Sequence, residues 1–393
     1  MSVSKNIEQI MMSSSWIRRM FEEGARLKAK HGSEKVFDFS LGNPNLEPPK
    51  EFKDALLEVV QASTPGGHAY MPNAGYSATR RMVAQFLAGE QGSLITEHDI
   101  IMTCGAAAGL NLVFKTILNP GENVIVPAPY FVEYSFYVSN HGGTLVPVQT
   151  EPDFDLDIEA VEAACTEKTR ALLINSPNNP TGKIYSKEGL ESLAAMLLKK
   201  SKEFGRTIYL VSDEPYRKIV FDNRVVPGVL PIYSDSIVVT SYSKDLSIPG
   251  ERIGFVVVSP RSEYRETLAA GLTLANRILG FVNAPALMQR VIAKLQGIGV
   301  DPKVYQEKRD LLSNALHDYG YCFEKPEGAF YLFPKTPIPD DVAFVRALQE
   351  ELILTVPGSG FGCPGYFRIA YCVDNETIIR ALPGFRRTMA KFK

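Results

Sequence analysis

Cysteine is scarce in this chain, and its cysteines do not fall in pairs. The five cysteines among 393 residues are odd in number, and no two are spaced as C-x-x-C. Disulfide frameworks and zinc sites depend on paired or closely spaced cysteines. The sequence therefore predicts a protein of a reducing compartment, with neither a disulfide framework nor a metal site.

Long apolar runs and an excess of one charge are missing as well. No uninterrupted run approaches the roughly 18–20 apolar residues of a membrane span. The first residues, MSVSKNIEQIMM, include Lys5 and Glu8 and lack the apolar core of a signal peptide. A formal net charge of -2 offers nucleic acid or an anionic membrane no attraction. We expect a cytoplasmic protein that binds neither of them.

What the chain does have is length and an alternating rhythm. Its 393 residues, 45% of them hydrophobic, exceed what one core needs, which favours two domains. Short β-branched runs alternate with helix-like stretches, a pattern typical of a largely parallel sheet covered on both faces. The expected strands are residues 100–103, 123–126, 144–148, 171–175, 207–212, 237–240 and 252–259, with helices at 106–117 and 187–204 among them.

The rhythm changes after about residue 283 into a smaller α+β pattern. Expected here are helices at 284–295, 302–319 and 376–391 and strands at 329–333 and 367–372. Near the other end, residues 14–31 place Ile17, Met20, Phe21 and Leu27 at helical spacing, and the loop LGNPNLEPP follows at 41–49. We expect a large domain at 48–283 and a small domain formed by 1–47 and 284–393.

The stretch SYSKDLSIPGERIGF, residues 241–255, places a lysine just after a buried strand. Burial lowers the pKa of Lys244 and makes its amine a usable nucleophile. Ser241, Ser243 and Arg252 nearby suit an anion such as phosphate. An amine that forms a Schiff base beside a phosphate site suggests pyridoxal phosphate, whereas most lysines are solvated surface charges.

Other polar residues follow the carboxyl ends of expected strands, where open parallel sheets bind ligands. A helix beginning at Gly105 could hold a phosphate on its free N–H groups, and Tyr130 could cover a planar ring. Asn179, in the turn NSPNNPTG, could reach a ligand oxygen. Asp213 could pair with a protonated ring nitrogen, and Tyr216 could reach a ring hydroxyl.

Each of these features also has a purely structural interpretation. The glycine-alanine helix start could reflect tight packing, the Asn/Pro turn could be only a turn, and Asp213 could form an internal salt bridge. Arg368, in the strand YFRIAYC, calls for a carboxylate that is either internal or from a substrate. It is the joint occurrence of these residues that favours a catalytic site.

Three motifs stand in one order along the chain: NSPNNPTG at 175–182, SDEPY at 212–216 and S-x-S-K-x7-R at 241–252. Together they resemble the class I and II aminotransferases of the fold-type-I pyridoxal-phosphate enzymes, with aspartate-aminotransferase-like bacterial members the nearest likeness. The resemblance covers nearly the whole chain. It implies an α/β fold, with a large domain whose mostly parallel sheet lies between helices and a smaller α+β domain.

The same resemblance implies a pyridoxal 5'-phosphate-dependent aminotransferase of amino acid metabolism. It would move an amino group from an L-amino acid, aspartate-like or other, to a 2-oxo acid such as 2-oxoglutarate. Lys244 would form the Schiff base and carry out the 1,3-proton shift, and Asp213 would pair with the ring nitrogen. Asn179 and Tyr216 would bind the phenolic oxygen, and Tyr130 would stack on the ring.

The remaining roles concern the phosphate, the substrate and a second subunit. The phosphate cup would consist of Gly105, Ala106, Ala107, Ser241, Ser243 and Arg252. Arg368 would clamp the substrate α-carboxylate, with Gly42, Tyr130 and Asn179 beside it. Tyr70 matches a tyrosine that the family supplies from the partner subunit, which implies a homodimer.

The chain departs from the aspartate-specific pattern at one position, and other functions stay open. Some aspartate-specific relatives carry a lysine at the position of Ala107, where an alanine cannot hold a distal carboxylate. Arg277 could hold one, or it could be a surface arginine. The competing functions are a lyase or decarboxylase on the same fold, an aminotransferase-like regulator, and a nucleotide-binding Rossmann protein, although no G-x-G-x-x-G follows the first strand.

Overall fold

The computed structural model describes residues 3–12, 16–62 and 65–392. Two short helices open the chain, α1 (Lys5–Met12) and α2 (Trp16–His31). The second corresponds to the expected helix, and its Met20 and Leu27 are buried. Residues 14 and 15 and the side chains of Ile17 and Phe21 lie outside the described residues.

A seven-stranded sheet forms the centre of the molecule, in the order β2-β8-β7-β6-β5-β3-β4. Only β8 runs antiparallel to its neighbours; the other paired strands are parallel. The strands are β2 (Ile100–Thr103), β3 (Asn123–Ala128), β4 (Thr144–Gln149), β5 (Thr169–Asn175), β6 (Tyr209–Asp213), β7 (Ser236–Ser241) and β8 (Gly254–Val258).

Successive residues of these strands point to opposite faces, which divides the apolar side chains between two cores. Along β5, Leu172 and Ile174 belong to one core, and Ala171 and Leu173 belong to the other. Every strand of this sheet except β4, at one edge, is a nearly continuous apolar run, as expected for a sheet buried on both faces.

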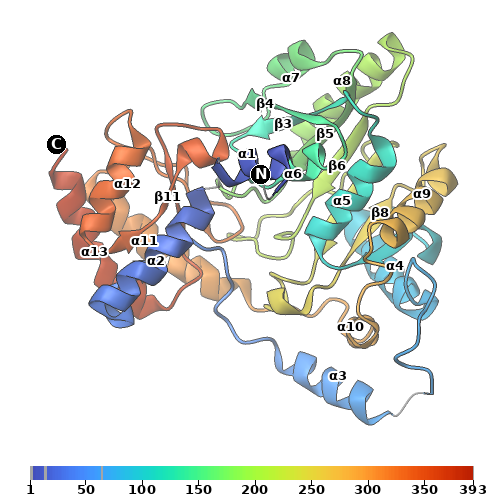
Figure 1. Cartoon of the computed structure of the whole chain (residues 1–393), viewed down its shortest axis with the longest axis horizontal. Coiled ribbons are helices and arrows are strands. Elements are labelled where there is room, and N and C mark those ends of the chain that lie inside the picture. The colour runs from blue at the N-terminus through green and yellow to red at the C-terminus, as the bar shows by residue number, and fades with distance from the viewer. Residues whose placement is uncertain (1–2, 13–15, 63–64, 393) are drawn as a thin grey trace.

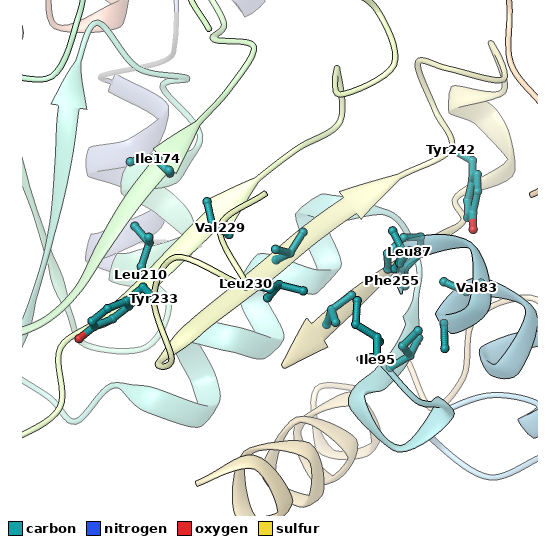
Figure 2. Packing of buried hydrophobic residues seen from close by; sticks show 14 of the residues in the cluster. Val83, Leu87, Ile95, Ile174, Leu210, Val229, Leu230, Tyr233, Tyr242 and Phe255 are labelled. Atoms are coloured by element: carbon teal, nitrogen blue, oxygen red, sulfur yellow. The ribbon is translucent and has the colours of Figure 1, made fainter. Parts of the chain in front are cut away.

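Helices cover both faces of the sheet (Figure 1). The core of one face includes side chains of α3 (Lys50–Gln61), α4 (Ser77–Gln91), α7 (Ile158–Ala164), α8 (Lys187–Glu203) and α10 (Ala286–Ile292). The opposite face packs against α5 (Ala106–Ile117), α6 (Tyr134–Ser139) and α9 (Arg265–Ile278). Figure 2 shows Leu87 of α4 beside Phe255 of β8 in the first of these cores.

A smaller body lies beside the sheet, at the left of Figure 1. Its core includes Met20 of α2 and the apolar faces of the C-terminal helices. Its elements are α11 (Pro302–Tyr319), α12 (Asp341–Glu350), α13 (Asn375–Ala390), the sheet β11 (Val356–Pro357), β12 (Phe367–Ala370) and β9 (Tyr331–Leu332), and the pair β1 (Phe37–Asp38) and β10 (Ile353–Leu354). Short 3-10 turns are η1 (Ser33–Lys35), η2 (Glu97–Asp99), η3 (Pro249–Glu251) and η4 (Gly358–Phe361).

The architecture confirms the α/β fold class that the sequence predicts. The expected strand at 100–103 and the expected helices at 106–117 and 302–319 have the observed bounds. The helix expected at 284–295 is shorter and corresponds to α10. The buried apolar residues of α10 pack in the core of the large sheet. The domain boundary at 284 stays a prediction. None of the helices in the described ranges combines the length and the apolar character that crossing a membrane requires.

Candidate active site

The parallel strands bring their polar carboxyl ends to one edge of the sheet. Asn175 ends β5, Asp213 ends β6 and Ser241 ends β7. At this edge lies a cavity of about 280 Å³ that these three residues line together with Lys244 and Arg368. Residues far apart in the sequence thus surround a single space.

Lys244 follows β7, and its amine lies inside the cavity wall. Burial lowers the pKa of this amine to about 8. Nζ donates a hydrogen bond to the Gly42 carbonyl at 2.7 Å and lies 5.5 Å from the centre of the Phe330 ring. The amine therefore has an accessible neutral, nucleophilic form near physiological pH.

Asp213 is a buried carboxylate whose two oxygens differ. Its Oδ2 accepts a hydrogen bond from the Tyr134 hydroxyl at 2.7 Å, whereas Oδ1 is buried without a partner. Burial raises the pKa of Asp213 to about 7, although the bond from Tyr134 opposes this. The neighbouring Glu214 instead pairs with Arg217 at 3.0 Å, so it is Asp213 that calls for a further donor.

The beginning of α5 and the connection from β7 to β8 form a cradle for an anion. Gly105 precedes α5 with φ +84°, and no side chain caps the helix. Ala106 and Ala107 line the cavity, so the uncapped first turn of α5 lies at the cavity end of the sheet. A Cβ at Gly105 would lie 2.8 Å from Nη2 of Arg252. Ser241 and Ser243 line the same cavity, and Arg252 donates to the Cys104 carbonyl at 3.3 Å.

Arg368, on β12, is a fully buried guanidinium. Nη1 donates to Oδ1 of Asn179 at 3.0 Å and Nη2 to the Ser40 carbonyl at 2.6 Å, while Nε has no partner. The guanidinium lies 4.7 Å from the centre of the Tyr331 ring. No internal carboxylate forms an ion pair with Arg368 among the described residues, which leaves the carboxylate expected for it to come from a ligand.

Tyr216 points its hydroxyl toward a second tyrosine. Its oxygen lies 2.7 Å from the hydroxyl oxygen of Tyr331, and both side chains are buried. The Asn179 backbone, in turn, is held by a bond from its N–H to Oδ1 of Asn175 at 2.7 Å. These contacts fix the two residues that the sequence assigns to the phenolic oxygen.

Most residues expected in the site line this cavity, but Gly105, Tyr130, Tyr70 and Arg277 do not; Gly105 directly precedes the lining residues Ala106 and Ala107. Tyr130 is not among the lining residues, whereas its neighbour Phe131 is. Tyr70 is 92% exposed and lies outside the cavity. Arg277 is exposed on α9 and lines a separate hollow beside Arg80.

Several cavity residues carry no signal in the sequence that could have singled them out. Tyr134 lies four residues beyond Tyr130, and Tyr331 lies in an apolar strand where any aromatic residue would suit the core. Only Phe131 had a usable signal, because it follows β3 in the same motif as Tyr130. The contacts of the two tyrosines depend on tertiary structure.

The donor set fits pyridoxal 5'-phosphate. A partnerless buried carboxylate oxygen on Asp213 suits a protonated ring nitrogen, and the buried amine of Lys244 suits an aldehyde. The cradle at Gly105, which a Cβ would fill, suits a phosphate. The fold and this cavity therefore define a fold-type-I enzyme of the pyridoxal-phosphate class.

Comparisons with known proteins identify the family. The model for "aminotransferase class I and II" matches residues 34–384. The aspartate/prephenate aminotransferase of Thermus thermophilus is 33% identical over 359 residues, which span 89% of this chain and 90% of that protein. The chain belongs to the class I and II aminotransferases, a pyridoxal-phosphate-dependent family.

Solved structures agree with this assignment. An amino transferase from Eubacterium rectale superposes with a TM-score of 0.97 at 41% identity, with 100% of both chains covered. The aspartate aminotransferase from Thermus thermophilus with maleate superposes with a TM-score of 0.87 at 28% identity, covering 99% of this chain and 100% of that one. The protein is thus an aminotransferase by fold and by family.

Proposed function

We propose that this enzyme transfers the amino group of an L-amino acid to a 2-oxo acid, with 2-oxoglutarate as the acceptor. The observation that carries the proposal is the meeting of Lys244, Asp213 and Arg368 in one cavity. An amine nucleophile, a partner for a ring nitrogen and a carboxylate clamp are the three groups that amino transfer needs.

Lys244 would hold the cofactor and then move a proton. Pyridoxal phosphate, when bound, supplies an aldehyde that captures amines and a ring that takes up electrons from the substrate Cα. Nζ of Lys244, released by the incoming substrate amine, would act as general base at Cα. Its pKa of about 8 suits both tasks at neutral pH.

Asp213 and Tyr134 would govern the ring nitrogen. A cationic partner at Oδ1 stabilises the ionised carboxylate and so opposes the effect of burial on its pKa. The ionised carboxylate in turn holds a proton on the nitrogen. Tyr134 fixes the orientation of the carboxylate through Oδ2.

Arg368 would orient the substrate through its carboxylate. A bidentate, charge-assisted contact contributes roughly 1.5–3 kcal/mol and sets geometry as well as affinity. The aromatic rings of Tyr331 and Phe361, 4.7 and 4.8 Å from the guanidinium, hold its plane in place. The Cα–H bond of the substrate can then be presented to Lys244.

The amino donor is an open choice between acidic and uncharged side chains. The relative from Thermus thermophilus is named an aspartate/prephenate aminotransferase, which makes aspartate a candidate. The cations that line the cavity in the described chain are Lys244, Arg252 and Arg368, and each has a proposed role. Ala107 offers no charge, so a distal carboxylate would depend on the partner subunit.

We propose that the enzyme is a homodimer in which Tyr70 reaches the partner's cavity. In its own chain this large side chain is almost fully exposed and contributes nothing to the site. A tyrosine on a Pro/Asn/Gly loop is well placed to cross a two-fold interface.

An absorbance scan tests the cofactor first. The purified protein, loaded with pyridoxal phosphate, should show a near-visible band that borohydride removes by fixing the cofactor to Lys244. A panel of amino donors with 2-oxoglutarate should then yield keto acids without free ammonia. A protein that stays colourless contradicts the cofactor, and ammonia release would indicate a lyase.

A further inference from the structure

The hydrogen bond between the hydroxyls of Tyr216 and Tyr331 can run in either direction, and the proposed function decides which tyrosine donates. The two oxygens are 2.7 Å apart, and neither hydroxyl has another hydrogen-bond partner among the described residues. Each hydroxyl has one hydrogen to donate. Whichever tyrosine donates to the other has no hydrogen left for a ligand.

Tyr331 is placed to be the donor of this pair. It lies on β9, beside the strand β12 that carries Arg368, and is buried to 2% exposure. A Cβ at Gly42 would lie only 1.9 Å from the Tyr331 hydroxyl oxygen, so Gly42 crowds that oxygen. Tyr216 and Tyr331 both line the cavity, and the sequence assigns the ligand contact to Tyr216.

We infer that Tyr331 donates its hydrogen bond to the oxygen of Tyr216, and that this leaves the Tyr216 hydrogen free for the phenolic oxygen of the cofactor. The inference rests on the proposed function, because it needs that cofactor. Linked hydrogen bonds polarise one another, so a donated bond makes Tyr216 the stronger donor. Tyr331 is therefore a positioning residue that acts through Tyr216.

The sign of the effect follows from charge. Negative charge on the phenolic oxygen favours a proton on the nearby nitrogen that links Lys244 to the cofactor. A hydrogen bond from Tyr216 withdraws some of that charge and lowers the pKa of the linkage. Loss of the Tyr331 hydroxyl weakens this bond and raises the pKa.

The test is a pH titration of the visible absorbance of the loaded enzyme. We expect Tyr331→Phe to raise the midpoint by about 0.3–1 pH unit and to keep the ring beneath Arg368. Tyr216→Phe should raise it further, and adding Tyr331→Phe to that variant should change nothing more. Tyr305→Phe is the matched control, because it removes a buried, partnerless hydroxyl from the same aromatic cluster and should leave the midpoint unchanged.

Two results would overturn the inference. A fall in the midpoint of Tyr331→Phe would mean that Tyr216 donates to Tyr331, since removal of the acceptor would then release the Tyr216 hydrogen. An equal shift in the presence and absence of the Tyr216 hydroxyl would mean that Tyr331 acts by another route. A wild-type protein without the visible band would instead contradict the proposed function.

If the Tyr331→Phe protein does not fold or does not bind the cofactor, a second measurement tests the inference. 3-Fluorotyrosine installed in place of Tyr331 keeps the shape and makes the hydroxyl a stronger donor. The midpoint should then fall, and a rise or an unchanged value would contradict the direction of the bond.

Discussion

At the scale of single residues, the cavity holds two groups whose pKa values are displaced toward each other. Burial raises the pKa of Asp213 to about 7 and lowers that of Lys244 to about 8. Both charged forms lose solvation. Among the described residues Oδ1 of Asp213 has no hydrogen-bond partner, and the Lys244 amine donates to the Gly42 carbonyl rather than to a carboxylate. Each group is thus primed for a ligand that compensates for the lost water.

Asp213 should make the stability of the cofactor-free protein depend on pH. An acid whose pKa is raised on folding binds more protons in the folded state, so stability falls as pH rises from about 4 to about 7. Over this pH range, we expect the free energy of unfolding of Asp213→Asn to fall by roughly 2–4 kcal/mol less than that of the wild-type protein. Urea unfolding across that pH range measures it, and parallel profiles for the two proteins would contradict the prediction.

Tyr134 should set the pH at which Asp213 ionises. Tyr134→Phe removes the one bond that lowers the pKa of Asp213, so the acid limb of kcat/KM should move to higher pH. At neutral pH the loss should be about 10-fold or more, because the bond involves a charged group.

The matched control is Tyr233→Phe. The buried hydroxyl of Tyr233 donates to the Ile208 carbonyl at 2.9 Å. Tyr233 belongs to the core on one face of the sheet, whereas Tyr134, which bonds Asp213, belongs to the core on the other face. That variant should lose stability but keep the wild-type pH profile. A Tyr134→Phe enzyme with an unmoved acid limb would show that Tyr134 does not act through Asp213.

At the scale of elements, the sequence predicts best where local signals agree. The helix α11 has the predicted bounds because Asp301 caps it, Pro302 opens it and Gly320 ends it with φ +90°. The helix expected at 284–295 is shorter because Pro285 stands at its N-cap and Lys294 bonds back three residues to Val291. Apolar periodicity alone does not show such turns.

The same contrast holds in the site. Lys244 and Asp213 could be found because parallel strands end at a common edge, so a polar residue after each strand is informative. Tyr331 could not be found, because its contact with Tyr216 joins residues 115 positions apart, one in the turn after β6 and the other on β9 of the smaller sheet. Its only local signal is an apolar strand.

The turn into α5 gives a prediction at this scale. Gly105→Ala forces a side chain into a positive-φ position and against Arg252, so affinity for pyridoxal phosphate should fall about 10-fold or more. Gly89→Ala is the matched control, because α4 leaves open space there and alanine favours a helix. Fluorescence titration with the cofactor measures both, and equal affinities would contradict the cradle.

At the scale of the whole molecule, the N-terminal segment joins the two bodies at the cavity. The Gly42 carbonyl accepts from Lys244, on the large sheet's edge, and the Ser40 carbonyl accepts from Arg368, on the small sheet. The amine of Lys244 and the guanidinium of Arg368 therefore both donate to backbone carbonyls within residues 40–42.

The homodimer proposal gives a prediction that only an assembly can show. Lys244→Ala and Tyr70→Ala should each be nearly inactive as pure dimers. Mixed dimers should recover about half of the wild-type rate, because one of their two sites then has both intact residues. Co-purification of differently tagged chains measures this. Inactive mixed dimers would place Tyr70 in its own chain's site, and a fully active Tyr70→Ala dimer would place it outside both sites.

The antiparallel strand β8 has a consequence for how this enzyme could be altered. Because β8 turns back beside β7, Lys244 and Arg252 lie on one connection between adjacent strands. The proposed covalent contact and the proposed phosphate contact with the cofactor would therefore both come from this one connection. On this proposal, we expect a change in the length of that connection to alter the spacing between the two contacts and so to favour cofactor analogues in which aldehyde and phosphate are farther apart or closer together.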